Sequence, residues 1–401
     1  ACEHLFRTRM RLGMFDSTEY DSLCYKDVET KEHLALSRKA AETACVLLKN
    51  DGILPLDMNK IDTIGVIGPN AQSIGALRGN YYGTASRYET ILMGIQDKFS
   101  GRVLYSEGCD IVKDKPDGLS LPMHRIAEAQ AVADNSDVVI LCVGLDEGLE
   151  GEEGDQSNED GSGDKRSLLL PRCQQQLIEA VLDRGKPTVI ILASGSSLNV
   201  NTVRENALIQ AFYPGSEGGK AVADILFGTV SPSGKLPVTF YKHMEDLPEF
   251  TDYCMRSRTY RYDDYSKDQI LYPFGYGLTY SDISVGDVKL TDKGDKLIAD
   301  ITLSNSGMTG EDVVEVYFKS ESKDAVKNHA LCAFKRVRLE KGETSELRLE
   351  ILKKNLTVVS NDGVRYLDSS APVTLYFGTS QPDELSCRLT GKSAVAKRIT
   401  L

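Results

Sequence analysis

The sequence predicts a layered α/β domain that is followed by a β-sandwich. Residues 46 to 230 alternate between short apolar runs of strand length and segments of helix length, which is typical of βαβ units. Residues 281 to 401 instead carry short alternating segments separated by turns, with few helical patterns. The unbroken apolar run 138 to 143 is a third indication, because such a run suits a strand buried on both faces of a parallel or mixed sheet.

The first elements are helical. Leu5, Phe6, Met10 and Leu12 lie at near-helical spacing, and Gly13 ends the pattern. The pattern has no cap before it, so we expect it to be the last helix of a preceding domain. A second helical pattern covers residues 31 to 49 and is stopped by the turn at residues 50 to 52.

Strands and helices then alternate along the chain. We expect strands at residues 64–68, 103–105, 138–143, 189–192 and 207–212. We expect helices at residues 91–95, 123–134, 173–183 and 218–227.

Regular periodicity is lost between about residues 228 and 280, where Pro, Gly, Tyr and Arg dominate. Such a segment is expected to drape over a domain rather than fold by itself. Beyond it, five segments read as strands of a sandwich of roughly 115 residues: LIADITLSNSG, DVVEVYFKS, CAFKRVRLEKGE, SELRLEI and APVTLYFGTS.

Composition excludes several classes of function. The net charge is −12 and no basic stripe is present, so a nucleic-acid partner is not expected. No apolar stretch reaches membrane-spanning length and no leader is visible. The nine cysteines form no Cys-x-x-Cys pair, which favours a reducing compartment, and we expect a bacterial cytoplasmic protein. The histidines are isolated and GVIGPNAQSIG lacks dinucleotide-binding spacing, so neither a metal nor a cofactor is expected.

An acidic loop after the run 138–143 is the candidate site. In open α/β sheets, loops at the carboxyl ends of strands line the ligand crevice. Carboxylates crowded there raise one another's pKa, so that one of them can act as a general acid. A solvated surface loop is the competing interpretation. The acidic residues do not have the ligand spacing of a calcium-binding loop. The carboxylates are Asp146, Glu147, Glu150, Glu152, Glu153 and Asp155.

Taken together, the chain resembles the C-terminal part of glycoside hydrolase family 3. The resemblance covers nearly all of it, and the motifs occur in the family's order: LGMFD (12–16), VLLKNDGILPL (46–56), IGVIGPNA (64–71), GKLPVTF (234–240), YPFGYGLTY (272–280), SNSGMTGEDVVEVYF (304–318) and FKRVRLEKGE (334–343). The resemblance implies a three-layer α/β/α sandwich at 46–230, an irregular connecting segment at 231–280 and an Ig-like, fibronectin type III-like β-sandwich at 281–401. Residues 1–45 would be linker helices from an N-terminal (β/α)₈ barrel that these residues do not contain.

The family's members are retaining, exo-acting β-glycosidases. That reaction needs a carboxylate nucleophile and a second carboxyl group that acts as acid and then base. In the family the nucleophile is an aspartate of the barrel, and a glutamate of the loop described above is commonly the acid/base. Residues 144–152 match the family pattern G-[LI]-D-x-x-x-E-x-E. The resemblance therefore implies Glu152 as acid/base and Glu150 as its companion, with Glu153 as the neighbour that leaves the register open by one residue.

The segment 79–95 resembles the β-xylosidase-like branch, which implies Tyr82 and Arg87 as substrate-pocket residues. Packing for Tyr82 and a structural ion pair for Arg87 are the competing interpretations. We expect a β-xylosidase that acts on an oligosaccharide or aryl β-glycoside, with the barrel as partner and no hydrolysis by these residues alone. A β-glucosidase and a non-catalytic carbohydrate-binding or structural module are the alternatives. An apolar face left open without the barrel would favour a homo-oligomer.

Overall fold

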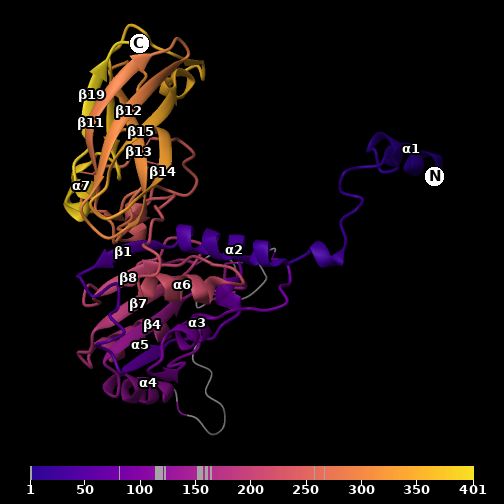
Figure 1. Cartoon of the computed structure of the whole chain (residues 1–401), viewed down its shortest axis with the longest axis vertical. Coiled ribbons are helices and arrows are strands. Elements are labelled where there is room, and N and C mark those ends of the chain that lie inside the picture. Colours follow the sequence, from indigo (N-terminus) through magenta and orange to yellow (C-terminus); the bar gives the residue numbers. More distant parts are fainter. Residues whose placement is uncertain are drawn as a thin grey trace.

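The computed structural model describes residues 2–80, 82–112, 121, 123–150, 157–158, 161–162, 165–256, 258–265 and 267–401. These residues form an α/β domain and a β-sandwich stacked along the long axis, and an N-terminal arm projects from the α/β domain (Figure 1).

A six-stranded sheet forms the centre of the α/β domain. Its strands lie in the order β1 (Val46–Asn50), β8 (Ala207–Gln210), β7 (Thr188–Ala193), β4 (Val138–Gly144), β2 (Thr63–Ile67) and β3 (Arg102–Ser106). All neighbouring pairs are parallel except β1 and β8. Every residue of β4 is buried, which confirms the prediction from its unbroken apolar run.

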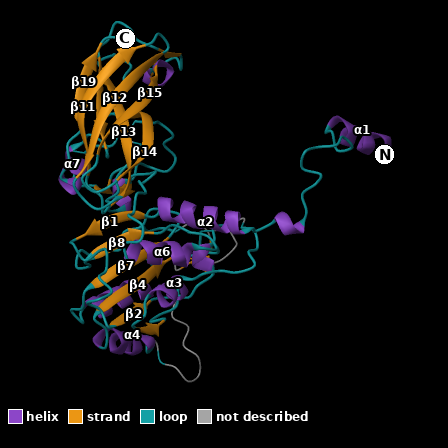
Figure 2. Cartoon of the chain, in the orientation of Figure 1, coloured by secondary structure: helices purple, strands orange, loops and turns teal. Residues whose placement is uncertain are grey.

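Helices cover both faces of this sheet. One apolar cluster joins α3 (Ile91–Lys98) and α6 (Gly218–Leu226) to one face, and α2 (Lys31–Ala44) packs on α6. A second cluster joins α4 (Arg125–Asp134) and α5 (Arg172–Leu182) to the other face. The three layers are seen in Figure 2, and they confirm the predicted α/β/α sandwich.

The sequence-based prediction was wrong for residues 46 to 49, which form β1 rather than the end of a helix. Helix α2 ends at Ala44, and Val46 pairs with Gln210 of β8. The side chains of Val46, Leu47 and Leu48 are all buried. A run of three apolar residues is compatible with either structure, and here burial on both faces of the sheet decides for the strand.

The β-sandwich packs two sheets around one apolar core. One sheet contains β11 (Ile283–Asp292), β12 (Lys296–Asn305) and β15 (Thr344–Leu352), and the other contains β14 (Ala330–Leu339), β13 (Gly310–Ser320), β18 (Val373–Gly378) and β19 (Val395–Ile399). The five predicted segments contribute β12, β13, β14, β15 and β18. Strands β11 and β19 and helix α7 (Glu384–Thr390) are additional.

Shorter elements complete the described residues. They are η1 (Tyr25–Asp27), η2 (Gly75–Leu77), β5 (Ser157–Asn158), β6 (Gly161–Ser162), β9 (Phe240–Tyr241), η3 (Met244–Asp246), β10 (Ile270–Tyr272), η4 (Lys353–Leu356), β16 (Val358–Val359) and β17 (Arg365–Tyr366).

The connecting segment, residues 231–280, contacts β1. Leu278 donates its backbone N–H to the carbonyl of Leu47 at 2.8 Å, and the buried Tyr276 hydroxyl donates to the carbonyl of Leu48 at 2.9 Å. Lys235 of this segment pairs with Asp312 of β13 at 2.8 Å, and both side chains are largely buried. The segment therefore joins the α/β domain to the sandwich through buried contacts.

The N-terminal arm begins with the predicted helix, α1 (Cys2–Arg11), which has no buried residue. In Figure 1 this helix lies well away from both domains. Its apolar side chains Leu5, Phe6 and Met10 are exposed. Within the ranges that the structure describes, no helix has the length and apolar character needed to cross a bilayer.

Candidate functional site

Strand β4 ends in a conformation that only glycine adopts easily. Gly144 has φ +143°, and a Cβ built on it would lie 1.9 Å from the carbonyl oxygen of Ala193. The buried Gln174 side chain of α5 holds the same residue, since it accepts from the Gly144 N–H at 2.8 Å and donates to the Gly144 carbonyl at 2.7 Å. The point at which the acidic loop leaves the sheet is therefore fixed.

Three strand ends meet at this edge of the sheet. The loop after β4 carries Asp146, Glu147 and Glu150, the loop after β7 carries Ser196, and Tyr213 lies beyond the end of β8. Parallel strands place their carboxyl ends together, so these loops line one edge. Contacts between them organise the described part of the acidic loop.

The Glu150 carboxylate accepts hydrogen bonds from Gly195, Ser196 and Tyr213. Its Oε1 accepts from the Ser196 N–H at 2.9 Å and from the Ser196 hydroxyl, and its Oε2 accepts from the Gly195 N–H at 2.5 Å and from the Tyr213 hydroxyl. A carboxylate has about four lone-pair sites, and these donors fill them. Glu150 therefore serves as an anchor for the loop, because a proton added to it would displace a donor.

Tyr213 acts as a neutral donor in this arrangement. Burial raises the pKa of its phenol, and the negative charge of Glu150 raises that pKa further. Its hydroxyl also lies 3.2 Å from the Asp146 carbonyl oxygen. The phenol therefore keeps its proton and binds two points of the same loop.

Glu147 forms the second attachment of the loop. It pairs with Arg78, which follows η2, and both side chains are largely buried. The Arg78 guanidinium carbon lies 3.8 Å from the centre of the Tyr82 ring and 5.7 Å from that of Tyr88. Among the described residues, Glu147 Oε2 and Arg78 Nε have no hydrogen-bond partner although both atoms are buried.

Asp146 is the carboxylate for which the predicted pKa effect is seen. Burial is the largest cause of its raised pKa, and the charges of Glu147 and Glu150 add to it. The backbone N–H groups of Gly148 and Leu149, each 3.0 Å from Oδ1, oppose the rise. Crowding thus contributes to the raised pKa, but burial contributes more.

The structure describes only some of the predicted site residues. Glu150 is placed as described above, whereas Glu152 and Glu153 lie outside the described residues. Tyr82 stacks on Arg78 and its side chain is 47% exposed, and Arg87 pairs with Glu89 at 2.5 Å. The structure thus brings Tyr82 to the acidic loop through Arg78. It gives Arg87 the ion pair that was its competing interpretation.

The described residues contain no group of three or more His, Cys, Asp or Glu side chains arranged to hold a metal ion.

Sequence reasoning missed Tyr213, Ser196, Gln174 and Arg78. A usable signal was present for two of them, because Tyr213 directly follows the predicted strand 207–212 and Ser196 lies four residues beyond the predicted strand 189–192. The rule that placed the acidic loop at the crevice applies equally to those strand ends. Gln174 and Arg78 carried no comparable signal, since a glutamine on a helix and an arginine in a glycine-rich loop are ordinary surface residues.

Comparison with known proteins places these features in a family. Residues 45–280 match the glycosyl hydrolase family 3 C-terminal domain, and residues 312–381 match the fibronectin type III-like domain. A β-xylosidase of Formosa agariphila is 30% identical over 409 residues, which cover 96% of this chain and 54% of that protein. A periplasmic β-glucosidase of Salmonella typhimurium is also 30% identical, over 88% of this chain and 50% of that protein.

A solved structure shows the same arrangement. The β-glucosidase of Erythrobacter marinus superposes with a TM-score of 0.80 at 30% identity, covering 97% of this chain and 53% of that one. The chain therefore spans about half the length of the relatives that it matches.

Proposed function

This chain belongs to glycoside hydrolase family 3, and we propose that it is the C-terminal portion of a retaining, exo-acting β-glycosidase. In this proposal the chain supplies the acid/base carboxylate, and a (β/α)₈ barrel elsewhere in the full-length protein supplies the nucleophile. The anchored loop after β4 is the observation that carries the proposal.

The anchoring of Glu150 supports an assignment within the loop. Since its lone pairs are filled by four donors, Glu150 has no free site from which to protonate a leaving group. Glu152 follows two residues later in the sequence and matches the family's acid/base position. We therefore assign acid/base catalysis to Glu152, keep Glu153 as the neighbouring candidate, and assign a positioning role to Glu150.

The division of the site between two domains follows from the chemistry. A retaining mechanism needs two carboxyl groups about 5 Å apart, one to form the glycosyl-enzyme and one to protonate the leaving group and later activate water. The described carboxylates of the loop, Asp146, Glu147 and Glu150, are all engaged in holding it. The nucleophile is therefore assigned to the barrel, and the chain alone is expected to be inactive.

The sugar is proposed to be a terminal β-linked xylose. Relatives from Formosa agariphila and from plants bear β-xylosidase names, which favours this choice. A β-glucosidase is the second candidate, favoured by the likeness to the Salmonella and Erythrobacter enzymes. Tyr82, held by Arg78 beside the loop, and Arg87 are proposed to border the sugar-binding site.

Hydrolysis of 4-nitrophenyl β-xyloside and β-glucoside tests the proposal. The chain would be assayed alone, with its separately expressed barrel, and as the full-length enzyme. We expect hydrolysis only when the barrel is present, with the xyloside preferred. Hydrolysis by the chain alone would contradict the divided site. If the folded full-length enzyme hydrolyses neither substrate, a non-catalytic carbohydrate-binding or structural module would be favoured.

A further inference from the structure

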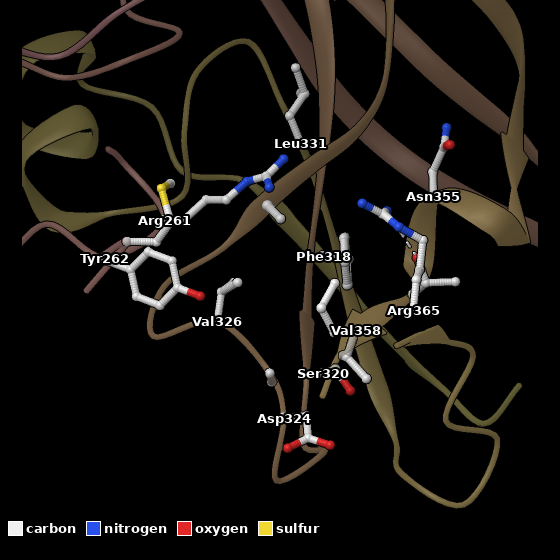
Figure 3. Close-up of a pocket in the computed structure, with 15 residues that line it drawn as sticks. Arg261, Tyr262, Phe318, Ser320, Asp324, Val326, Leu331, Asn355, Val358 and Arg365 are labelled. Atoms are coloured by element: carbon white, nitrogen blue, oxygen red, sulfur yellow. Dashed lines mark hydrogen bonds between the residues drawn. The ribbon is translucent and has the colours of Figure 1, made fainter. Parts of the chain in front are cut away.

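A cavity outside the acidic loop lies between the connecting segment and the β-sandwich. Its volume is about 350 Å³, which is within the range of about 300–1,000 Å³ typical of small-molecule sites. Phe318 and Val326 contribute apolar walls, and Val358 of β16 closes the side opposite Tyr262 (Figure 3).

Two arginines converge on this cavity from different parts of the chain. Arg261 comes from the connecting segment and Arg365 from β17, and Figure 3 shows their guanidinium groups pointing toward one another across the cavity. In the part of the chain that the structure describes, neither forms an ion pair with a carboxylate. Both side chains are exposed at the cavity, and a guanidinium suits a carboxylate or sulfate group because its donors form a planar fork.

Both arginines are held by neighbouring groups. Arg261 Nε lies 3.4 Å from the Tyr260 hydroxyl, and the Tyr260 ring stacks on Phe274 with their centres 4.1 Å apart. Asn328 fixes the same segment, since it donates to the carbonyls of Tyr260 and Asp263 at 2.9 and 2.8 Å. These contacts hold the backbone on both sides of Arg261, whose own side chain is exposed.

Arg365 is positioned from the opposite side. Its Nη1 donates to the Thr357 hydroxyl at 3.3 Å within the β16–β17 hairpin. Among the described residues, the side chains of Arg261 and Arg365 donate only these hydrogen bonds. A guanidinium binds carboxylate or sulfate oxygens through paired hydrogen bonds.

The rest of the cavity suits a sugar ring. Tyr262 and Phe318 offer aromatic surface, and Asn355, whose amide nitrogen donates to the Cys332 carbonyl at 2.9 Å, also lines the cavity. Asp324 lies at the end of the cavity away from the guanidinium groups, and its carboxylate accepts from the Tyr366 hydroxyl at 2.7 Å. An anion at the arginine end would therefore be separated from this carboxylate.

We propose that this cavity binds a sugar bearing an oxyanion group, a carboxylate or a sulfate ester, at a site distinct from the acidic loop. The oxyanion would lie between Arg261 and Arg365, and the ring would lie against Tyr262 and Phe318. The choice of a sugar rests on the proposed function, whereas the preference for an anion rests on the arginines alone. Such a site would hold an acidic branch of an oligosaccharide on the sandwich.

Isothermal titration of the chain itself tests this proposal without any need for hydrolysis. The ligands are glucuronic acid, glucose 6-sulfate, neutral glucose and inorganic sulfate. We expect one of the two anionic sugars to bind with a Kd in the range of about 1 mM, and glucose and inorganic sulfate to bind at least about tenfold more weakly, a difference of about 1.4 kcal/mol. Raising the salt concentration should weaken the binding.

Variants separate the site from general charge effects. Arg261→Gln and Arg365→Gln should each weaken binding about tenfold or more. The matched control is Arg338→Gln, because Arg338 lies at the opposite end of β14 from the cavity and its partner Glu340 is exposed. Circular dichroism would show that all three variants fold.

Three results would overturn the proposal: no binding by any anionic sugar up to about 20 mM, equal binding of glucose, or equal losses in the control variant. Equal binding of inorganic sulfate would overturn the proposal that the ligand is a sugar, because the cavity would then bind an anion without any contribution from a sugar ring. Since aryl glycoside hydrolysis is measured separately, failure here is distinguishable from failure of the proposed function.

Discussion

The hydroxyl of Tyr213, beyond the end of β8, donates a hydrogen bond to the carboxylate of Glu150 in the loop after β4. This contact joins two strand ends that are separated by β7 in the sheet. Together with the donors of Gly195 and Ser196, this hydrogen bond occupies the lone pairs of the Glu150 carboxylate. The sequence suggested Glu150 as a companion of the acid/base, and in the structure it holds the loop in place.

Replacing Tyr213 by Phe should therefore destabilise the α/β domain. The change removes one donor from a partly buried carboxylate, and hydrogen bonds to charged groups contribute about 1.5–3 kcal/mol. The melting temperature of the chain should fall by several degrees. Tyr253→Phe is the control, because Tyr253 is 83% exposed. Equal melting temperatures for the two variants would contradict the anchoring role.

Removing Arg78 should leave Glu147 as an unpaired, largely buried carboxylate. Breaking a buried pair costs about 3–5 kcal/mol. Because this pair retains some exposure, we expect Arg78→Met to lower the free energy of unfolding by about 2 kcal/mol, measured by urea unfolding. The double variant Arg78→Met/Glu147→Gln should recover most of the lost free energy of unfolding, because no unpaired buried carboxylate remains.

The exposed pair Arg184–Asp134 provides the comparison for this variant. Arg184→Met should lose much less stability than Arg78→Met, because solvent screens an exposed ion pair. If Arg78→Met and Arg184→Met lose the same amount, the buried pair does not hold the loop.

Glu315 of β13 should make stability depend on pH. It lines an apolar cavity of about 420 Å³ between the connecting segment and the sandwich, and burial raises its pKa to about 7. The charge of Lys235 and the Tyr317 hydroxyl, at 2.8 Å, oppose this rise in pKa, and the charge of Asp312 supports it.

Because the folded-state pKa of Glu315 is raised, its stabilising contribution is complete below the unfolded pKa of about 4.5 and is lost as pH rises towards about 7. The loss amounts to about 3 kcal/mol. Urea unfolding between pH 4.5 and 8 should show this decline, and Glu315→Gln should flatten it. The idea fails if the variant retains the full pH dependence.

Much of the fold was predictable from local patterns. The run 138–143 identified β4 because a strand buried on both faces needs an unbroken apolar run, and the predicted helices at residues 173–183 and 218–227 appear as α5 and α6. Residues 46–49 were assigned wrongly because their strand is defined by pairing with β8, which is more than 150 residues away in sequence. Local patterns do not report such distant pairing.

The candidate site was predictable only as far as its loop. The position of the acidic residues after β4 pointed to the crevice edge, yet the roles within the loop depend on partners from other segments. Tyr213 and Ser196 come close to Glu150 through the order β8–β7–β4 in the sheet. Arg78 reaches Glu147 from the other side, because β2, which precedes it, is the other neighbour of β4. A sequence pattern names the carboxylates, but it does not show which of them are already engaged.

If Glu150 anchors the loop while Glu152 performs acid/base chemistry, Glu150→Ala and Glu152→Ala should behave differently in the barrel-containing enzyme. Both variants would be assayed for hydrolysis of an aryl β-xyloside with and without azide. Loss of a general acid–base group lowers turnover by about 10²–10⁴-fold, and azide should partly restore turnover in Glu152→Ala because it attacks the glycosyl-enzyme without a base. Glu150→Ala should lower the melting temperature and show no rescue. Azide rescue of Glu150→Ala, with Glu152→Ala retaining wild-type turnover, would instead make Glu150 the acid/base.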